Sequence, residues 1–112
     1  MAEGKVRVII KRPDEEFGHV TNISPRLENL QNTVGGYIET FTLGVYEWGS
    51  IYVICNEEGR LQGLPYNCEL PAFGVDFCGD IIVASADPEG EMIDLPISFG
   101  AWKDLITGNS DF

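Results

Sequence analysis

Glu57 and Glu58 come closest, among the 112 residues of this chain, to a pair of side chains that could do acid–base chemistry. Paired carboxylates can serve as general acid and general base when both face one substrate. These two are adjacent within Asn56-Glu57-Glu58-Gly59, a sequence that predicts a turn, and neighbouring turn residues usually diverge into solvent. We therefore interpret the pair as part of a solvated turn in which Asn56 hydrogen-bonds the turn backbone.

Nucleophilic and metal-binding side chains are sparse. The three cysteines, Cys55, Cys68 and Cys78, form no C-x-x-C pair, and the single histidine, His19, is far from them along the chain. This spacing matches no zinc motif, and cysteines beside apolar runs are typically buried and reduced. We therefore predict that the protein is not an enzyme, that it has no catalytic residues, metal or cofactor, and that it occupies a reducing, cytoplasmic compartment.

Side chains in or near predicted loops are the remaining candidates for a site, because exposed loop aromatics favour binding surfaces. Asn56 and Asn67 would read the polar edge of a ligand if they converge. The candidate binding residues are Tyr46, Trp48, Asn56, Glu57, Glu58, Arg60, Tyr66, Asn67 and Phe73.

The elements that must position these residues begin with a short helix predicted over residues 24–34. Ser24 is expected to cap it, and Leu27, Leu30 and Val34 fall on one face at helical spacing.

Gly35 and Gly36 separate this helix from a strand predicted over residues 37–43. Because the two glycines follow a helix instead of preceding one, they lack the context of a phosphate-binding loop. We interpret them as structural residues: a helix stop with at least one glycine at positive φ and no ligand beside it.

The chain is long enough for one core, and we treat residues 1–112 as a single domain. The predicted architecture is α+β, a mostly antiparallel sheet of about five or six strands with two short helices, the second over about residues 98–107. Loops are expected over residues 13–24 and 65–77. The other strands are predicted over residues 5–11, 51–55, 60–64, 79–85 and 91–95, with 60–64 returning antiparallel to 51–55.

Charge is the strongest compositional signal, with a net charge of −11. Four of the seven basic residues lie in the first twelve positions, and from Pro13 onward three basic residues face seventeen acidic ones, a net of −14. Direct binding of nucleic acid through phosphate contacts is therefore excluded, and no apolar run approaches the ~20 residues of a membrane span. The acidity either keeps a small protein soluble or imitates a phosphate backbone, and the sequence leaves both open.

Three stretches together resemble one family: LQNTVGGYIE (residues 30–39), CNEEGRLQGLPYN (residues 55–67) and GDIIVAS (residues 79–85). The chain is similar, over roughly residues 6–95, to the domain of unknown function 3846 of phages and bacterial mobile elements. The resemblance implies no catalytic residues. It implies a gene that travels with phages and conjugative elements, whose small accessory proteins often act against host defences.

The leading hypothesis is a non-enzymatic phage or mobile-element accessory protein. It would bind a host protein, one that acts on nucleic acid or in defence, through an acidic surface and inhibit it in the host cytoplasm. The alternative is a small-molecule binder that sequesters a nucleotide signal, with residues 66–77 and the Asn56 turn as its wall and with Arg60, Arg26 and the basic first strand supplying positive charge for phosphates. A weak hydrolase ranks last. We also expect a homodimer, paired through edge strands such as residues 5–11 or 91–95.

Overall fold

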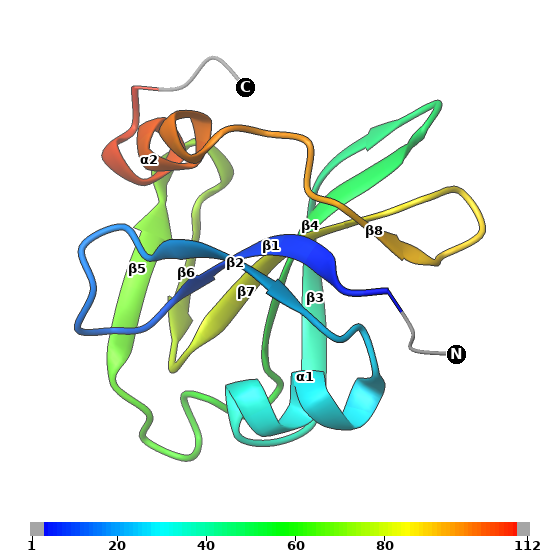
Figure 1. Cartoon of the computed structure of the whole chain (residues 1–112). Coiled ribbons are helices and arrows are strands. Elements are labelled where there is room, and N and C mark those ends of the chain that lie inside the picture. The colour runs from blue at the N-terminus through cyan, green and yellow to red at the C-terminus, as the bar shows by residue number, and fades with distance from the viewer. Residues whose placement is uncertain (1–3, 110–112) are drawn as a thin grey trace.

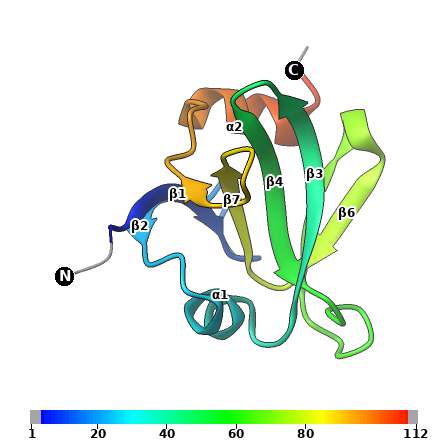
Figure 2. The same cartoon turned by 90° about the vertical axis from the view of Figure 1, so that its right-hand side faces the viewer.

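The computed structural model describes residues 4–109, and the sheet that organises them is covered on both faces (Figures 1 and 2). In chain order the elements are β1 (Val6–Lys11), β2 (His19–Ile23), α1 (Leu27–Val34), β3 (Ile38–Tyr46), β4 (Gly49–Asn56), β5 (Tyr66–Leu70), the 3-10 helix η1 (Pro71–Phe73), β6 (Val75–Cys78), β7 (Ile81–Ala86), β8 (Met92–Ile93) and α2 (Phe99–Thr107).

Within these described residues the main sheet has six antiparallel strands in the order β2-β1-β7-β4-β3, with β8 paired to the end of β7. Helix α1 packs on one face, while α2 and the separate two-stranded ribbon β5-β6 pack on the other. The predicted α+β class, with two helices and a mostly antiparallel sheet of five or six strands, is confirmed.

Strand β7 is buried along its whole length because both faces of the sheet are covered there. Ile81 and Val83 join the core beneath α2 and the ribbon, and Ile82 and Ala84 join the core beneath α1. This alternation is the two-residue period of a strand. The apolar run in the sequence therefore predicted this strand correctly.

Helix α1 starts later than predicted. Its first residue is Leu27, Arg26 takes the extended N-cap conformation, and Ser24 lies outside the helix. Leu27 is 56% exposed, so only Leu30 and Val34 of the predicted face are buried. Ser24 as cap and Leu27 as a core residue were wrong, because Arg26 holds the N-cap position and the first turn of the helix is exposed.

Gly35 ends α1 in the left-handed conformation, with φ of 81°, and its N–H donates to the Gln31 carbonyl at 2.8 Å. The predicted helix stop with one glycine at positive φ is confirmed. Gly36 does not have a positive φ. A glycine is needed at position 36 for a steric reason, because a Cβ there would lie 2.9 Å from Asn56 Nδ2.

Local signals predicted α2 correctly. The Ser98 hydroxyl oxygen accepts a hydrogen bond from the Ala101 N–H at 3.1 Å, and Gly108 ends the helix. Trp102 is fully buried, and its Nε1 donates to the Phe17 carbonyl at 2.8 Å.

Neither helix of residues 4–109 has the length and apolar composition that crossing a membrane requires.

Three predictions about connecting segments were wrong. Residues 60–64 were expected as a strand, but residues 57–63 form a turn, and the neighbours of β4 are β3 and β7. The expected loop over residues 65–77 contains β5, η1 and β6, and that over residues 13–24 contains β2. Strands β2, β5 and β6 are short and peripheral, so their residue pattern alone does not predict a strand, and pairing with a neighbouring strand determines them. Because β2 pairs with β1, strand β1 is no edge for dimerisation, and the homodimer itself stays a prediction.

Candidate binding cleft

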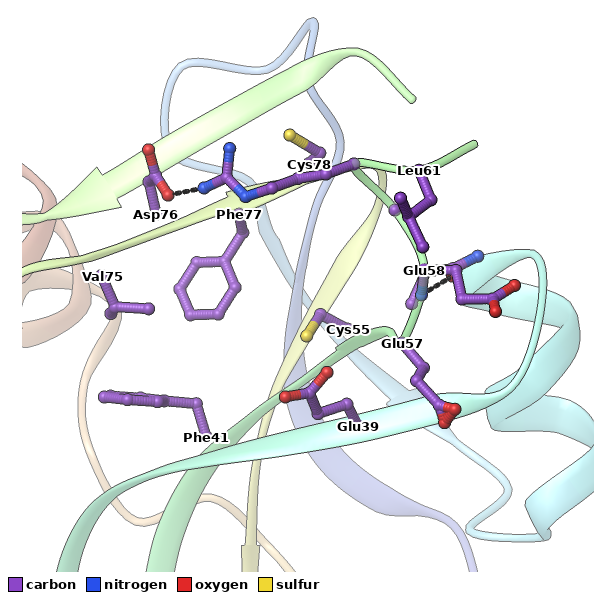
Figure 3. Close-up of a pocket in the computed structure, with 13 residues that line it drawn as sticks. Glu39, Phe41, Cys55, Glu57, Glu58, Leu61, Val75, Asp76, Phe77 and Cys78 are labelled. Carbon is purple, nitrogen blue, oxygen red and sulfur yellow. Dashed lines mark hydrogen bonds and ion pairs between the residues drawn. The ribbon is translucent and has the colours of Figure 1, made fainter. Parts of the chain in front are cut away.

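A cleft of about 410 Å³ opens where β3 and β4 face strand β6 of the ribbon (Figure 3). We call it the acidic cleft. Its apolar floor consists of Phe41, Cys55, Val75 and Phe77, and its rim consists of Glu39, Glu57, Glu58, Arg60 and Asp76. The rings of Phe41 and Phe77 meet edge to face, with centroids 6.3 Å apart. The cleft thus combines an aromatic floor with a rim rich in carboxylates.

The strand register brings Glu39 to the rim above the floor. Glu39 and Cys55 are direct partners in the β3–β4 ladder, and side chains two residues apart share one face of a strand. Glu39 and Phe41 therefore point to the same side as the buried Leu43. Burial, reinforced by the charge of Glu39, raises the pKa of the Cys55 thiol to about 11.

Asn56 builds the turn that carries the other rim residues. Its Oδ1 accepts a hydrogen bond from the Glu58 N–H at 2.7 Å, and its carbonyl accepts one from the Gly59 N–H at 3.2 Å. Its Nδ2 donates to the Val34 carbonyl at 3.1 Å, which ties the turn to the end of α1. The structure places Asn56 in the turn role that the sequence predicts, with Glu57 and Glu58 exposed at the rim (Figure 3).

Arg60 is the one basic residue among the described residues that line the acidic cleft, and it is ion-paired with Asp76. Four carboxylates therefore surround the opening against one guanidinium. Exposed ion pairs contribute little and exchange readily, so the pair does not close the cleft to other charged groups. The net field at the cleft favours a positively charged ligand.

The basic residues of β1 do not offset this acidity at the surface. Lys11 is only 2% exposed, and its ammonium donates to Asn67 Oδ1 at 2.8 Å. The Arg7 guanidinium donates to the carbonyl of Ile97 at 2.9 Å. Part of the positive charge counted in the net −11 is thus held inside the domain and does not offset the carboxylates at the cleft.

Asn67 lies away from the acidic cleft. Its Nδ2 donates to the carbonyls of Lys11 and Gly79 at 2.8 and 2.7 Å, whereas Asn56 binds the end of α1. The two asparagines do not converge, so the predicted polar ligand site between them was wrong. The physical reason is that each side-chain amide already donates hydrogen bonds to backbone carbonyls inside the domain.

The candidate aromatic residues separate into different places. Tyr46 and Trp48 stack, with centroids 5.2 Å apart, at the tip of the β3–β4 hairpin, which is the end remote from the Asn56 turn (Figure 1). Phe73 is half-buried and meets Phe41 edge to face at 6.1 Å, beneath the floor of the cleft. Tyr66 is 55% exposed and lines a separate hollow. Of these four, only Phe73 supports the acidic cleft.

The thiols of Cys55 and Cys68 predict how stability depends on pH. Burial raises the pKa of each to about 11, above the ordinary value of 9.0. Between pH 9 and pH 11 the folded state still binds these thiol protons, whereas the unfolded state has lost them. The stability that the two thiols contribute is therefore intact below pH 9 and is lost as the pH rises towards 11. Urea unfolding near pH 8 and near pH 10.5 measures the loss. Replacing both cysteines with alanine should reduce it, and an equal loss in that variant would contradict the assignment.

Comparison with known proteins places the chain in a family. A family model described as "Domain of unknown function (DUF3846)" matches residues 6–104. The chain belongs to this family. No curated protein and no solved structure shows a significant match. The match spans every described strand of this DUF3846 domain and therefore includes the whole acidic cleft.

The three sequence stretches that resemble the family meet at one end of the DUF3846 domain. Residues 30–39 join residues 55–67 through the Asn56–Val34 bond and through the Glu57 N–H, which donates to the Tyr37 carbonyl at 2.8 Å. Residues 79–85 join residues 55–67 through the Gly79 N–H, which donates to the Pro65 carbonyl at 2.7 Å. These stretches build the end of the molecule that carries the acidic cleft.

Sequence reasoning missed Glu39 and Phe41 as members of this site, whereas Asp76 and Phe77 lie within residues 66–77, a candidate wall of the alternative nucleotide site. A signal for Glu39 was present, since Glu39, Phe41 and Leu43 alternate on one face of a strand and a carboxylate there interrupts an apolar face. No local pattern placed Asp76 and Phe77 opposite β3 and β4, because β6 was not predicted as a strand. Among residues 4–109, no three His, Cys, Asp or Glu side chains gather into a metal site.

Proposed function

We propose that this DUF3846 domain is a non-enzymatic binding protein that receives a basic segment of a partner protein in the acidic cleft. The observation that carries the proposal is a rim of four carboxylates whose only described cationic neighbour, Arg60, is already paired with Asp76. The family resemblance supplies the setting: an accessory protein of a phage or mobile element that inhibits a host protein in the host cytoplasm. Host proteins that act on nucleic acid or in defence carry basic segments for phosphate contacts, which the acidic cleft would occupy.

The floor of the cleft, like its rim, has a composition that suits a cationic ligand. Phe41 and Phe77 are the only aromatic residues among the described residues that line the cleft, and Phe41, which is only partly buried, offers more of its ring than Phe77. Guanidinium and ammonium groups are attracted to aromatic rings and cover apolar surface with their methylene stems. An arginine or lysine side chain would therefore satisfy the floor and the rim together.

A nucleotide ligand, the alternative function, has less support from the same geometry. Its phosphates would face the carboxylates of Glu39, Glu57 and Glu58, and Arg60 would have to leave Asp76 to bind them. Hydrolysis ranks last, because Glu57 and Glu58 are adjacent, exposed residues of a turn.

A basic peptide tests the proposal. We expect a fluorescein-labelled peptide of about ten residues, rich in arginine, to bind the wild-type domain at low salt and to weaken as ionic strength rises. Glu57→Gln with Glu58→Gln should weaken binding by about 5- to 30-fold, at roughly 0.5–1 kcal/mol per lost charge. Fluorescence anisotropy measures both. The charge-matched control is Glu89→Gln with Glu91→Gln, exposed residues of the β7–β8 turn, which should change affinity little.

Arg60→Gln separates the two candidate functions by the sign of its effect. Removing this guanidinium frees Asp76 and should strengthen binding of the arginine peptide several-fold. The same change should weaken any nucleotide, because it removes the positive charge nearest the cleft. Arginine-peptide binding that is unchanged in the Glu57 and Glu58 double variant, or lost in Arg60→Gln, would refute the proposed function.

A further inference from the structure

Two further hollows continue the acidic cleft around the same end of the domain. The first, of about 540 Å³, shares Asn56, Glu57 and Glu58 with the acidic cleft, and we call it the amide hollow. The second, of about 650 Å³, meets the amide hollow at Gly35, and we call it the apolar hollow. Shared lining residues make the three concavities neighbours around this end of the domain. In Figure 3, Glu57 and Glu58 lie at the end of the acidic cleft next to the cyan helix α1.

The amide hollow is lined by side chains that can both donate and accept hydrogen bonds. Gln31, Asn32 and Gln62 surround it, with Tyr37, which is 74% exposed, at its edge. Gln62 is already oriented, because its Oε1 accepts from Asn56 Nδ2 at 3.3 Å. Amide groups with both capacities match the alternating N–H and C=O groups of an extended peptide backbone.

The apolar hollow has different walls. Leu64, Pro65 and Tyr66 form one side, and Val34 at the end of α1 forms another. Polar groups lie at its edge, where the Arg12 guanidinium is 3.7 Å from an Asp80 carboxylate oxygen. A concavity with apolar and aromatic walls and a few polar groups at its edge is the kind that anchors a large apolar side chain.

We propose that the partner segment is an extended peptide with two anchors, a basic residue in the acidic cleft and a large apolar residue in the apolar hollow. Its backbone would cross the amide hollow between them. This inference rests on the proposed function. It adds that the ligand is an extended peptide and that the protein also selects a large apolar residue in it. Charge complementarity selects the occupant, because Glu57 and Glu58 stand where the first two concavities join and favour a cationic segment over an anionic one. The apolar anchor would supply affinity that salt does not screen.

Designed peptides test the two-anchor motif. Each carries two arginines and one phenylalanine separated by about two to six small residues, in both orders along the chain. Matched peptides carry serine in place of phenylalanine. We expect the best phenylalanine peptide to bind about tenfold more tightly than its serine match, with the gain preserved at high salt.

Variants locate the second anchor. Tyr66→Ala should abolish the gain from phenylalanine while leaving the serine peptide unaffected, and it should fold because Tyr66 is 55% exposed. Trp48→Ala, an exposed aromatic at the remote hairpin tip, is the matched control and should keep the gain. As a second readout, backbone amide signals of Leu64 and Gly79 should shift with the phenylalanine peptide only.

The outcomes separate this inference from the function on which it rests. Equal affinity of phenylalanine and serine peptides at every spacer length, with arginine-dependent binding intact, would overturn the two-anchor motif and leave the proposed function standing. A gain that survives Tyr66→Ala would also overturn it. Absence of arginine-dependent binding for all peptides would overturn both.

Discussion

Asn67→Leu should lower the free energy of unfolding by about 3 to 5 kcal/mol, because a buried ammonium loses its shortest hydrogen bond and keeps only the longer ones to the carbonyls of Arg12 and Asn67. The Lys11 ammonium is buried, and its shortest hydrogen bond, 2.8 Å, is to Asn67 Oδ1. The Asn67 Nδ2 also donates to the carbonyls of Lys11 and Gly79. Leucine has a similar volume but replaces none of these bonds, so two buried carbonyls and one ammonium lose a partner at once.

A double-mutant cycle checks the cause. Lys11→Met removes the ammonium, and in that background Asn67→Leu should cost much less, since an apolar pair of similar volume can replace a buried polar one. Urea denaturation of the four proteins gives the coupling energy. A loss below about 1 kcal/mol for Asn67→Leu alone, or the same loss in both backgrounds, would contradict this account of Lys11.

The fold was predictable where local signals are sufficient. Ser98 and Gly108 mark the two ends of α2, and the run in β7 is apolar except for Ser85. The ribbon β5-β6 was not predictable, because Pro71 and Gly74 in the connection are typical of a loop and the two short strands are stabilised only by pairing with each other. Long-range pairing, not propensity, determines these elements.

The candidate site was predictable in the same uneven way. Glu57, Glu58 and Arg60 belong to one turn, so the sequence shows them together. Asp76 reaches the rim from another strand of the fold, and no local pattern connects it to Arg60. From the sequence, Lys11 is a basic residue like any other that a ligand could contact. In the structure its ammonium is buried against Asn67, which lies 56 positions further along the chain, so no local pattern shows the contact. Composition predicted the sign of the surface charge but not which charges leave the surface.

Gly36→Ala should destabilise the domain by about 1 to 3 kcal/mol and should also weaken peptide binding by the folded protein. A Cβ at Gly36 would lie 2.9 Å from Asn56 Nδ2, so the Asn56 amide would have to move. That movement breaks its bonds to the Val34 carbonyl and the Glu58 N–H, and it displaces the turn that carries the rim of the acidic cleft.

Gly35→Ala is the matched control, because it tests backbone strain alone. Its Cβ would lie 4.0 Å from Asn56 Nδ2, which is ordinary contact, but a φ of 81° costs alanine about 1–2 kcal/mol. The melting temperature should fall, while the folded fraction keeps its affinity for the arginine peptide. In an Asn56→Ala background Gly36→Ala should become nearly neutral, and Gly35→Ala should keep its cost. If Gly36→Ala costs the same with and without the Asn56 side chain, the contact between the two does not explain the second glycine.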